Sequence, residues 1–357
     1  MTILEYINKY KDKTFDEVKF NEVDNAIFSS ISYIDLDGIV CNHSYRKISL
    51  KDAGDIYFEN YERRKNSMTA YKHALRIFKE IIKTKRYGDL LLYNYSYIGN
   101  EKKQFSAITI ELNPNLVYVS YEGTDHLVSG WEEDFKMSYM FPVEAQKYAI
   151  RYLDRFSVSN KNLILGGHSK GGNLALVAGM YANFMVRRKI VNVYCNDGPG
   201  LRKSQINSSR YKNVSKKLIS IIPNYSFVGL LLRHSSNYRV VLSNKKGFLA
   251  HDLLSWQVDD KEFISSELST FSKILNKSML EWLNKYDDFQ RKMFTDSLFD
   301  VFRRANVNSL VEIMDHKKNI LKLIFESRGI DKTTKKMMRD FIWVVFEYAK
   351  DYKNISD

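Results

Sequence analysis

Residues 163–175 read LILGGHSKGGNLA, in which an apolar run leads into a serine flanked by glycines. The run predicts a strand over 162–165, and the small residues that follow predict a helix from Gly171 to about Arg187. In this setting G-x-S-x-G describes a sharp strand-to-helix turn, where the serine takes strained backbone angles and the glycines let strand and helix approach closely. We expect Ser169 on such a turn. A chance Gly-rich turn is the alternative, and the phosphate-loop pattern G-x-x-x-x-G-K-[ST] is absent.

The rest of the chain fits an α/β layer fold. A strand over Ile190–Cys195 follows the helix. Strand, helix and strand at this spacing form a βαβ crossover, which indicates a parallel sheet. Apolar segments predict further strands at 90–98, 105–112, 116–121, 217–222 and 238–243, and a helix at about 143–156. Before residue 90 the pattern is helical, with helix starts at Thr14 and Ser49, and from about 261 it is helical again. We predict an N-terminal helical segment (1–90) packed on an α/β core (91–260), with a helical C-terminal appendage (261–357).

The composition is that of a globular protein. Apolar residues make up 44% of 357 residues and charged residues 27%, which excludes a disordered chain. The two cysteines, Cys41 and Cys195, are too few for a disulfide framework or a Cys-based zinc site and suit a reducing compartment. The first twenty residues carry charges throughout, unlike a signal peptide, and no run approaches the roughly eighteen apolar residues of a membrane span. We expect a cytoplasmic protein.

A nucleophilic serine needs a base and an orienting acid, which follow it in the order Ser, acid, His in this kind of fold. Asp197 is the only carboxylate between Ser169 and His251, and it comes directly after the predicted strand 190–195. His251 follows the last predicted strand and is the preferred base. His234 stays open as the alternative, whereas His316 lies in a charged helical stretch and is expected on the surface.

The oxyanion of an acyl-transfer reaction needs two backbone donors. One is expected from Lys170, directly after the serine, with its side chain pointing outward. The other is expected from Thr124, because the predicted strand 116–121 ends in a tight turn at Glu122-Gly123. The plainest interpretations of Trp131 and Asp134, which follow this turn, are a core aromatic residue and a loop cap.

These motifs resemble a known family. Tyr121-Glu-Gly-Thr124, Trp131 and Asp134, followed by GHSKGG, are similar to the class 3 (fungal-type) lipases and, more closely, to a bacterial family of lipase-like α/β-hydrolases of undefined substrate. The stretches 24–33, 196–200 and 222–256 extend the resemblance to about residues 20–260. It implies an α/β-hydrolase fold with a mostly parallel sheet flanked by helices.

The resemblance also implies the site residues. Ser169 would be the nucleophile, Thr124 and Lys170 the oxyanion donors and His251 the base. The fungal-type lipases carry their acid in an Asp-x-Val segment where this chain reads Ser226-Phe-Val, so Asp197 would act from one strand earlier. They also have arginine at the position of Glu122. Should Asp197 lie away from the histidine, Asp252 and Asp259 are the next candidates.

Residues 201–250 hold ten cationic side chains and no carboxylate, out of a net charge of +13. They are either a solvated face or a surface that steers an anionic substrate or an acidic membrane toward the site. No nucleic-acid-binding signature is present. The six apolar residues 227–232 in this segment are expected to be buried. The ten cationic residues are Arg202, Lys203, Arg210, Lys212, Lys216, Lys217, Arg233, Arg239, Lys245 and Lys246.

Two hypotheses follow. The first is a serine hydrolase that cleaves a small-molecule or lipid ester through Ser169, Asp197 and His251, with no metal or organic cofactor and with peripheral contact to an acidic membrane surface. The second is a non-catalytic α/β-hydrolase-fold binding module, acting at a membrane or in a protein assembly. The position of Asp197, one strand earlier than the acid of the fungal-type lipases, and the additional helices favour the binding module. The intact GHSKG motif favours the hydrolase.

Overall fold

An eight-stranded sheet forms the centre of the computed structural model, which describes residues 1–43, 46–59, 69–100, 103–124, 128–234, 238–306, 323 and 326–340. The strands lie side by side in chain order, β1 to β8. β1 to β4 pair antiparallel, and β4 to β8 pair parallel. Their bounds are Ile48–Ser49, Leu91–Asn100, Lys103–Asn113, Leu116–Tyr121, Asn162–His168, Ile190–Asn196, Leu218–Pro223 and Tyr238–Val241.

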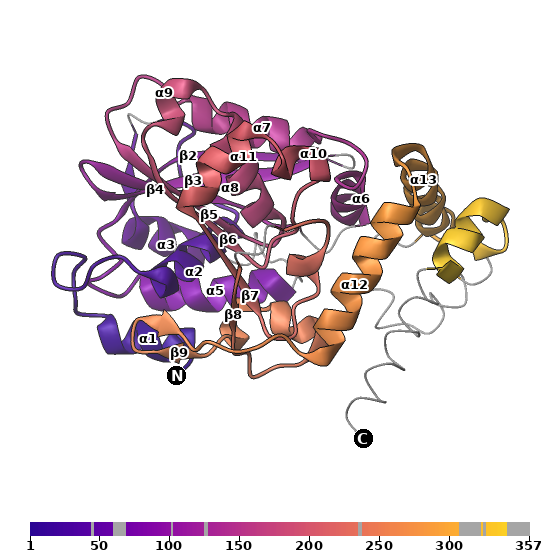
Figure 1. Ribbon diagram of the computed structural model, residues 1–357. Coiled ribbons are helices and arrows are strands. Elements are labelled where there is room, and N and C mark those ends of the chain that lie inside the picture. The colour runs from indigo at the N-terminus through magenta and orange to yellow at the C-terminus, as the bar shows by residue number, and fades with distance from the viewer. Residues whose placement is uncertain are drawn as a thin grey trace.

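The connections between the parallel strands place their helices on one face of the sheet. Right-handed crossovers between strands that follow one another in the same direction always return over the same face. Figure 1 shows α7, α8 and α11 together on that side. The connecting helices are α6 (Val128–Lys136), α7 (Glu144–Asp154), α8 (Lys170–Tyr181), α9 (Phe184–Arg187), α10 (Lys203–Ile206), α11 (Ser209–Val214) and the 3₁₀ turn η1 (Ser215–Lys217).

The N-terminal helices cover the opposite face. Along β4, Val117 and Val119 pack with α7 and α8, whereas Tyr118 between them packs with the N-terminal helices, as the alternation of a strand requires. The mostly parallel sheet, covered by helices on both faces, is that of an α/β-hydrolase fold, as expected. The N-terminal helices are α1 (Ile3–Tyr10), α2 (Glu22–Ile31), α3 (Leu50–Glu59) and α5 (Thr69–Ile81).

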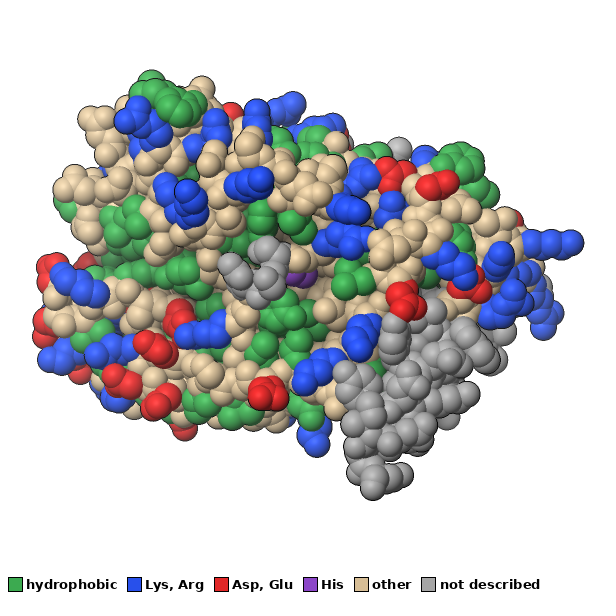
Figure 2. Space-filling model, in the orientation of Figure 1, with side chains coloured by type: hydrophobic (Ala, Val, Ile, Leu, Met, Phe, Trp, Pro, Cys, Tyr) green, Lys and Arg blue, Asp and Glu red, His purple; other side chains and the backbone are tan. Residues whose placement is uncertain are grey.

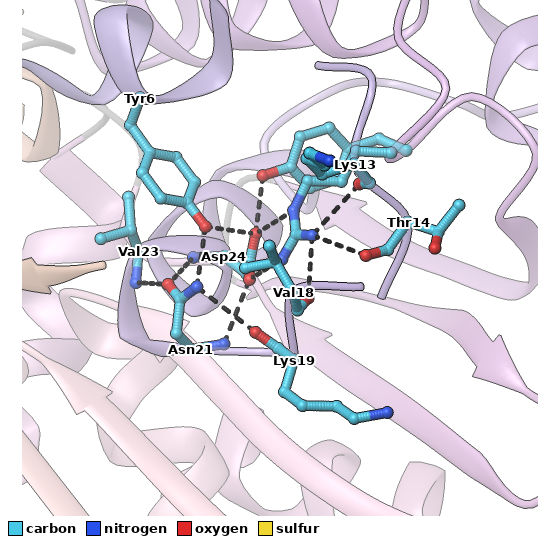
Figure 3. A network of polar contacts seen from close by, with 10 residues as sticks. Tyr6, Lys13, Thr14, Val18, Lys19, Asn21, Val23 and Asp24 are labelled. Atoms are coloured by element: carbon cyan, nitrogen blue, oxygen red, sulfur yellow. Dashed lines mark hydrogen bonds and ion pairs between the residues drawn. The ribbon is translucent and has the colours of Figure 1, made fainter. Parts of the chain in front are cut away.

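A buried ion pair fixes α2 to the segment after α5 (Figure 3). Asp24 accepts hydrogen bonds from Arg86 Nη2 at 2.6 Å, Arg86 Nε at 3.0 Å and Tyr87 Oη at 2.7 Å. Both charged side chains are fully buried. Arg86 Nη1 also donates to the carbonyl oxygens of Thr14 and Val18 at 3.4 and 3.0 Å. Burial raises the pKa of Tyr87 well above its ordinary value, and the Asp24 charge adds to the shift.

Arg86→Leu is therefore expected to destabilise the fold by about 3–5 kcal/mol, because it leaves the Asp24 carboxylate buried without its counter-charge. Urea denaturation of the variant measures this difference. The double variant Asp24→Leu/Arg86→Leu removes both charges and is expected to lose less. A single variant within about 0.5 kcal/mol of the parent, the range of ordinary surface changes, contradicts the assignment of this pair as a stabilising contact.

The same arginine explains one wrong prediction. Thr14 and Glu17 form the reciprocal hydrogen bonds of a helix start, yet residues 15–18 form only a turn. The Thr14 carbonyl oxygen accepts one helical hydrogen bond, from Val18 N at 3.0 Å, but the Val18 carbonyl oxygen accepts from Arg86 Nη1 at 3.0 Å instead of continuing the helix. The start predicted at Ser49 is confirmed, since Ser49 Oγ accepts from Asp52 N at the beginning of α3.

Two further boundaries differ from the expectation. The helix predicted to reach Arg187 ends at Tyr181, and α9 begins anew because the Asn183 side chain caps it by accepting from Met185 N. The segment after 260 is not entirely helical, because β9 (Val258–Asp259) and β10 (Glu262–Phe263) form a hairpin. Two-residue strands are too short to produce a periodic pattern.

The C-terminal helices α12 (Thr270–Lys285) and α13 (Asp288–Arg304) pack against the core. Trp282 and Leu283 of α12 share an apolar cluster with Met137 and Leu232 of the α/β core. Leu232 ends the apolar run 227–232, in which Val228 and Leu230 are also buried, as predicted. Within the described ranges, no helix is long and apolar enough to cross a membrane.

Candidate active site

Ser169 lies on the turn between β5 and α8, with φ 57° and ψ −134°. A non-glycine residue in this region is strained, and we call this strand-to-helix turn, residues 167–171, the elbow. The close approach of strand and helix explains the neighbouring glycine, because a Cβ at Gly167 would lie 2.3 Å from the backbone carbon of Gly171. The sequence pattern and the backbone geometry therefore agree at this turn.

Asp197 follows β6, at the sheet edge where β5 also ends. Its carboxylate is fully buried. Oδ2 lies 2.6 Å from His251 Nδ1, while Oδ1 accepts from Ser226 Oγ at 2.5 Å and from Gly229 N at 3.0 Å. Asp197 also has a positive φ of 47°, so two strained residues stand at this edge. Such strain persists only where the surroundings hold it in place.

His251 ends the 3₁₀ turn η3 (Gly247–His251), which follows β8. Its side chain is 17% exposed, in contrast to the buried Asp197. The ring lies against that of His168, with centroids 4.3 Å apart. Ser169 and His251, both of which the structure describes, form no direct hydrogen bond with each other. In enzymes without substrate, the hydrogen bond between nucleophile and base is often long and shortens only when substrate binds.

His168 holds the histidine loop in place. Its Nε2 lies 2.8 Å from the carbonyl oxygen of His251, and its Nδ1 lies 3.1 Å from Tyr33 Oη. Burial lowers the pKa of His168 well below its ordinary value, and the neighbouring His251 acts in the same direction. His168 is therefore neutral, and it links the elbow to the loop that carries His251.

The turn after β4 lies beside the serine. A Cβ at Gly123 would meet the Ser169 Cβ at 3.0 Å and the Tyr33 hydroxyl at 2.0 Å, so only glycine allows this approach. Thr124, the next residue, donates its hydroxyl to Asp134 Oδ2 at 2.5 Å. Asp134 thus ties the turn to α6, a role beyond the loop cap expected from the sequence. Trp131, on the same helix, packs near Phe248 with ring centroids 6.1 Å apart.

The Lys170 side chain does not point outward, and the expectation from the sequence was wrong. It is 1% exposed, and its Nζ lies 3.4 Å from Glu133 Oε2. The reason is the position of α8, whose residues from Lys170 to Met180 are all buried between the sheet and the neighbouring helices. Glu133 also accepts from Ala145 N at 2.9 Å, so the pair joins the elbow, α6 and α7.

The other candidates lie elsewhere. His234 has a ring nitrogen, Nε2, that is buried without a hydrogen-bond partner, and the histidine that contacts the Asp197 carboxylate is His251. Burial lowers its pKa to about 4. Asp252 pairs with His73 at 2.8 Å rather than with His251, and Asp259 is exposed on β9. His316 lies outside the described residues.

A cavity of about 570 Å³ opens beside His251. Its walls come from α2, α5 and the 3₁₀ turns η3 and η4 (Leu253–Ser255), and most of them are apolar. His168 and His251 form one side, and the exposed side chains of Phe248 and Leu249 lie at its margin. Among the residues that the structure describes, no group of three His, Cys, Asp or Glu side chains is arranged to hold a metal ion.

Several residues of the site were missed from the sequence. Ser226 stands where the fungal-type lipases carry their acid, and here it donates to the acid instead. Tyr33 and Asn25 belong to the stretch 24–33, which contributed to the family resemblance, but the sequence did not predict that these two side chains contact the site. Asn25 Nδ2 donates to Asn196 Oδ1 at 2.9 Å, directly before Asp197. Polar residues within the apolar helix 22–31 were the available signal, since buried amides need partners.

Comparisons with known proteins found a matching family model and matching solved structures. A family model described as Mbeg1-like matches residues 81–300, which is 220 of the 357 residues. Among solved structures, one match is a chain titled "Crystal structure of M37 lipase", with 15% sequence identity and a TM-score of 0.36. That match covers 57% of this chain and 67% of the lipase chain. In the comparison with curated proteins, none matched.

Proposed function

We propose that this chain, which belongs to the Mbeg1-like family, is a serine hydrolase that cleaves carboxylic esters. The observation that carries the proposal is the 2.6 Å contact between His251 Nδ1 and the buried Asp197 carboxylate, at the sheet edge that also bears Ser169 on a strained turn. A base oriented by an acid, beside a serine held in this conformation, is the arrangement that activates a hydroxyl nucleophile.

In the proposed reaction, Ser169 Oγ attacks the ester carbonyl while His251 Nε2 takes its proton. Asp197 holds the imidazole in the tautomer that carries its proton on Nδ1, and it stabilises the imidazolium that forms. The N–H groups of Thr124 and Lys170 donate to the tetrahedral oxyanion. His251 then returns the proton to the leaving alcohol, and water releases the acyl group from Ser169 by the same steps.

The apolar cavity beside His251 suits the hydrocarbon part of such an ester. Most of the surface that its walls present is apolar, although Arg76, Lys245 and the His73–Asp252 pair also line it, so it suits an acyl chain or an apolar alcohol. We therefore propose that the substrate presents several methylene groups or an aromatic ring to this cavity.

Labelling with a fluorophosphonate probe tests the proposed function, because only an activated serine reacts. We expect covalent labelling of the parent protein, located by mass spectrometry on the peptide that contains Ser169. Absence of labelling, together with absence of turnover on p-nitrophenyl esters, overturns the proposal and leaves a non-catalytic binding module.

Leu249→Asp tests the apolar cavity. The variant places a charge at the cavity margin. Because Leu249 is largely exposed there, we expect the variant to fold as the parent does. The kcat/KM for an octanoyl ester is expected to fall about tenfold relative to that for an acetyl ester, since the loss of one apolar contact of leucine size is worth about 1.5 kcal/mol. Val158→Asp, which places the same charge at another exposed position away from the cavity, is the control. An equal loss on both esters contradicts the cavity's role.

A further inference from the structure

A second cavity, of about 510 Å³, lies between the core and the C-terminal helices. It shares no lining residue with the cavity beside His251. Its walls come from Ser138 after α6, from residues 201–207, which include α10, from residues 232–233 after the 3₁₀ turn η2 (Val228–Leu230), and from residues of α12 and α13. Figure 2 shows Lys and Arg side chains gathered on this face between α10 and α12.

Four cationic side chains line this cavity, namely Arg202, Lys203, Arg233 and Arg291. Three of them belong to the basic segment 201–250. Other cations of that segment are occupied elsewhere, since Arg239 pairs with Glu22 and Lys217 donates to a backbone carbonyl. Four cationic side chains thus lie together at this one cavity.

One carboxylate partly compensates these charges. Asp288, which is half exposed, accepts from both Arg202 and Arg291. Arg233 donates to the uncharged amide oxygen of Asn284. Within the described part of the chain, neither Arg233 nor Lys203 has a carboxylate partner. Asp288 thus pairs with two of the four cations, and the charge of Asp287 also acts on Arg291.

The arginines are also partly withdrawn from water. The Arg291 side chain is 13% exposed, and its Nε is buried without an acceptor. Burial lowers the pKa of Arg291 below its ordinary value, and the charge of Arg202 acts in the same direction. A desolvated guanidinium with a donor unused interacts strongly with an anion that reaches it, because the charge is poorly screened there.

We propose that this cavity binds the phosphate group of a phosphomonoester, held by Arg202, Arg233, Arg291 and Lys203. Guanidinium groups match the oxygens of a phosphate in geometry and charge. Ser204 and Asn207 add neutral hydrogen-bonding groups, and Leu201, Leu232 and Leu283 give an apolar wall for the carbon part of the ligand. The cavity is larger than a phosphate ion, so it has room for the group that the phosphate esterifies.

The bound ligand contacts both the core and the C-terminal helices. Arg202 and Arg233 belong to the core, whereas Arg291 belongs to α13. Binding to these residues favours the state in which the two parts are packed together, so the ligand raises the thermal stability of the full chain.

Calorimetric titration of the full chain with glycerol 3-phosphate, in a phosphate-free buffer of low salt, tests the proposal. Sedimentation with phosphatidylcholine vesicles, with and without phosphatidic acid, distinguishes a lipid headgroup from a free phosphomonoester. We expect saturable binding in one of these arms and a rise in melting temperature with the ligand that binds. Failure of glycerol 3-phosphate and of phosphatidic acid vesicles alike overturns the proposal.

Matched variants locate the site. Arg233→Gln and Lys203→Gln are each expected to weaken binding about tenfold, as the loss of one charge-assisted contact does. They keep the Asp288 contacts, so folding is preserved. Lys216→Gln removes the same charge from an exposed residue of the basic segment outside the cavity, and we expect it to bind as the parent does. An equal loss in Lys216→Gln shows a diffuse basic surface and contradicts the site. Ser169→Ala is expected to bind the phosphate ligand unchanged, whatever its effect on hydrolysis.

Discussion

Ser169→Ala is expected to lower kcat for ester hydrolysis by about 10⁶-fold, to the level that binding and the oxyanion donors alone provide. The reason is that alanine lacks the oxygen on which the acyl-enzyme forms, and His251 then has no hydroxyl to deprotonate. Steady-state kinetics on p-nitrophenyl esters measures the loss, and fluorophosphonate labelling should disappear with it.

The backbone at this position supplies a control for folding. Ser169 has a positive φ, so alanine keeps the strain whereas glycine relieves it. We expect Ser169→Gly to be as inactive as Ser169→Ala and more stable than it by about 1 kcal/mol. Undiminished ester turnover in either variant would contradict the assignment of Ser169 as the nucleophile.

Asp197→Asn is expected to lower kcat by about 10⁴-fold with the fold intact. Ser226 Oγ and Gly229 N both donate to Oδ1, so the asparagine oxygen takes that position and its amide NH₂ group faces His251 Nδ1. Nδ1 must then accept a hydrogen bond, which moves the imidazole proton to Nε2. That tautomer cannot take the proton of Ser169.

Two control variants sharpen this test. Ser226→Ala removes one hydrogen bond to Asp197 but keeps the charge, and about a tenfold loss in kcat is expected. Asp252→Asn changes the residue directly after His251, whose carboxylate pairs with His73 instead, and its effect is expected to be small. If Asp252→Asn lowered kcat as much as Asp197→Asn, the acid would have to be reassigned.

The sheet and the elbow were predictable because local pattern determines them. Strands β4 to β6 contribute residues to the apolar clusters on both faces of the sheet, so their apolar runs stand out, and the serine between glycines follows one of them. Asp197 was found by elimination, since no other carboxylate lies between Ser169 and His251. The 2.6 Å contact with His251 agrees with that choice, although it depends on chain segments 54 residues apart.

The errors concern contacts that no local pattern encodes. The helix start at Thr14 has the right side chains and forms one helical hydrogen bond, but Arg86, 68 residues after Val18, donates to the Val18 carbonyl oxygen that would continue it. Lys170 has the sequence context of a surface residue, yet it lies buried opposite Glu133 of another helix. Ser226 carries no signal of its own as a partner of Asp197. Each depends on a polar partner that only the assembled core brings near.

The position of α2 has a consequence for how the chain is made. All residues from Val23 to Ile31 are buried, and their partners come late in the sequence: Ser29 meets Tyr118, 89 residues on, and Asn25 meets Asn196, 171 residues on. During synthesis, this helix therefore emerges long before the strands that cover it exist. Contacts this distant form slowly, and the apolar helix is exposed to other chains in the meantime. Refolding from denaturant should accordingly give more aggregate as protein concentration rises, and release from the ribosome should benefit from chaperones that hold apolar segments.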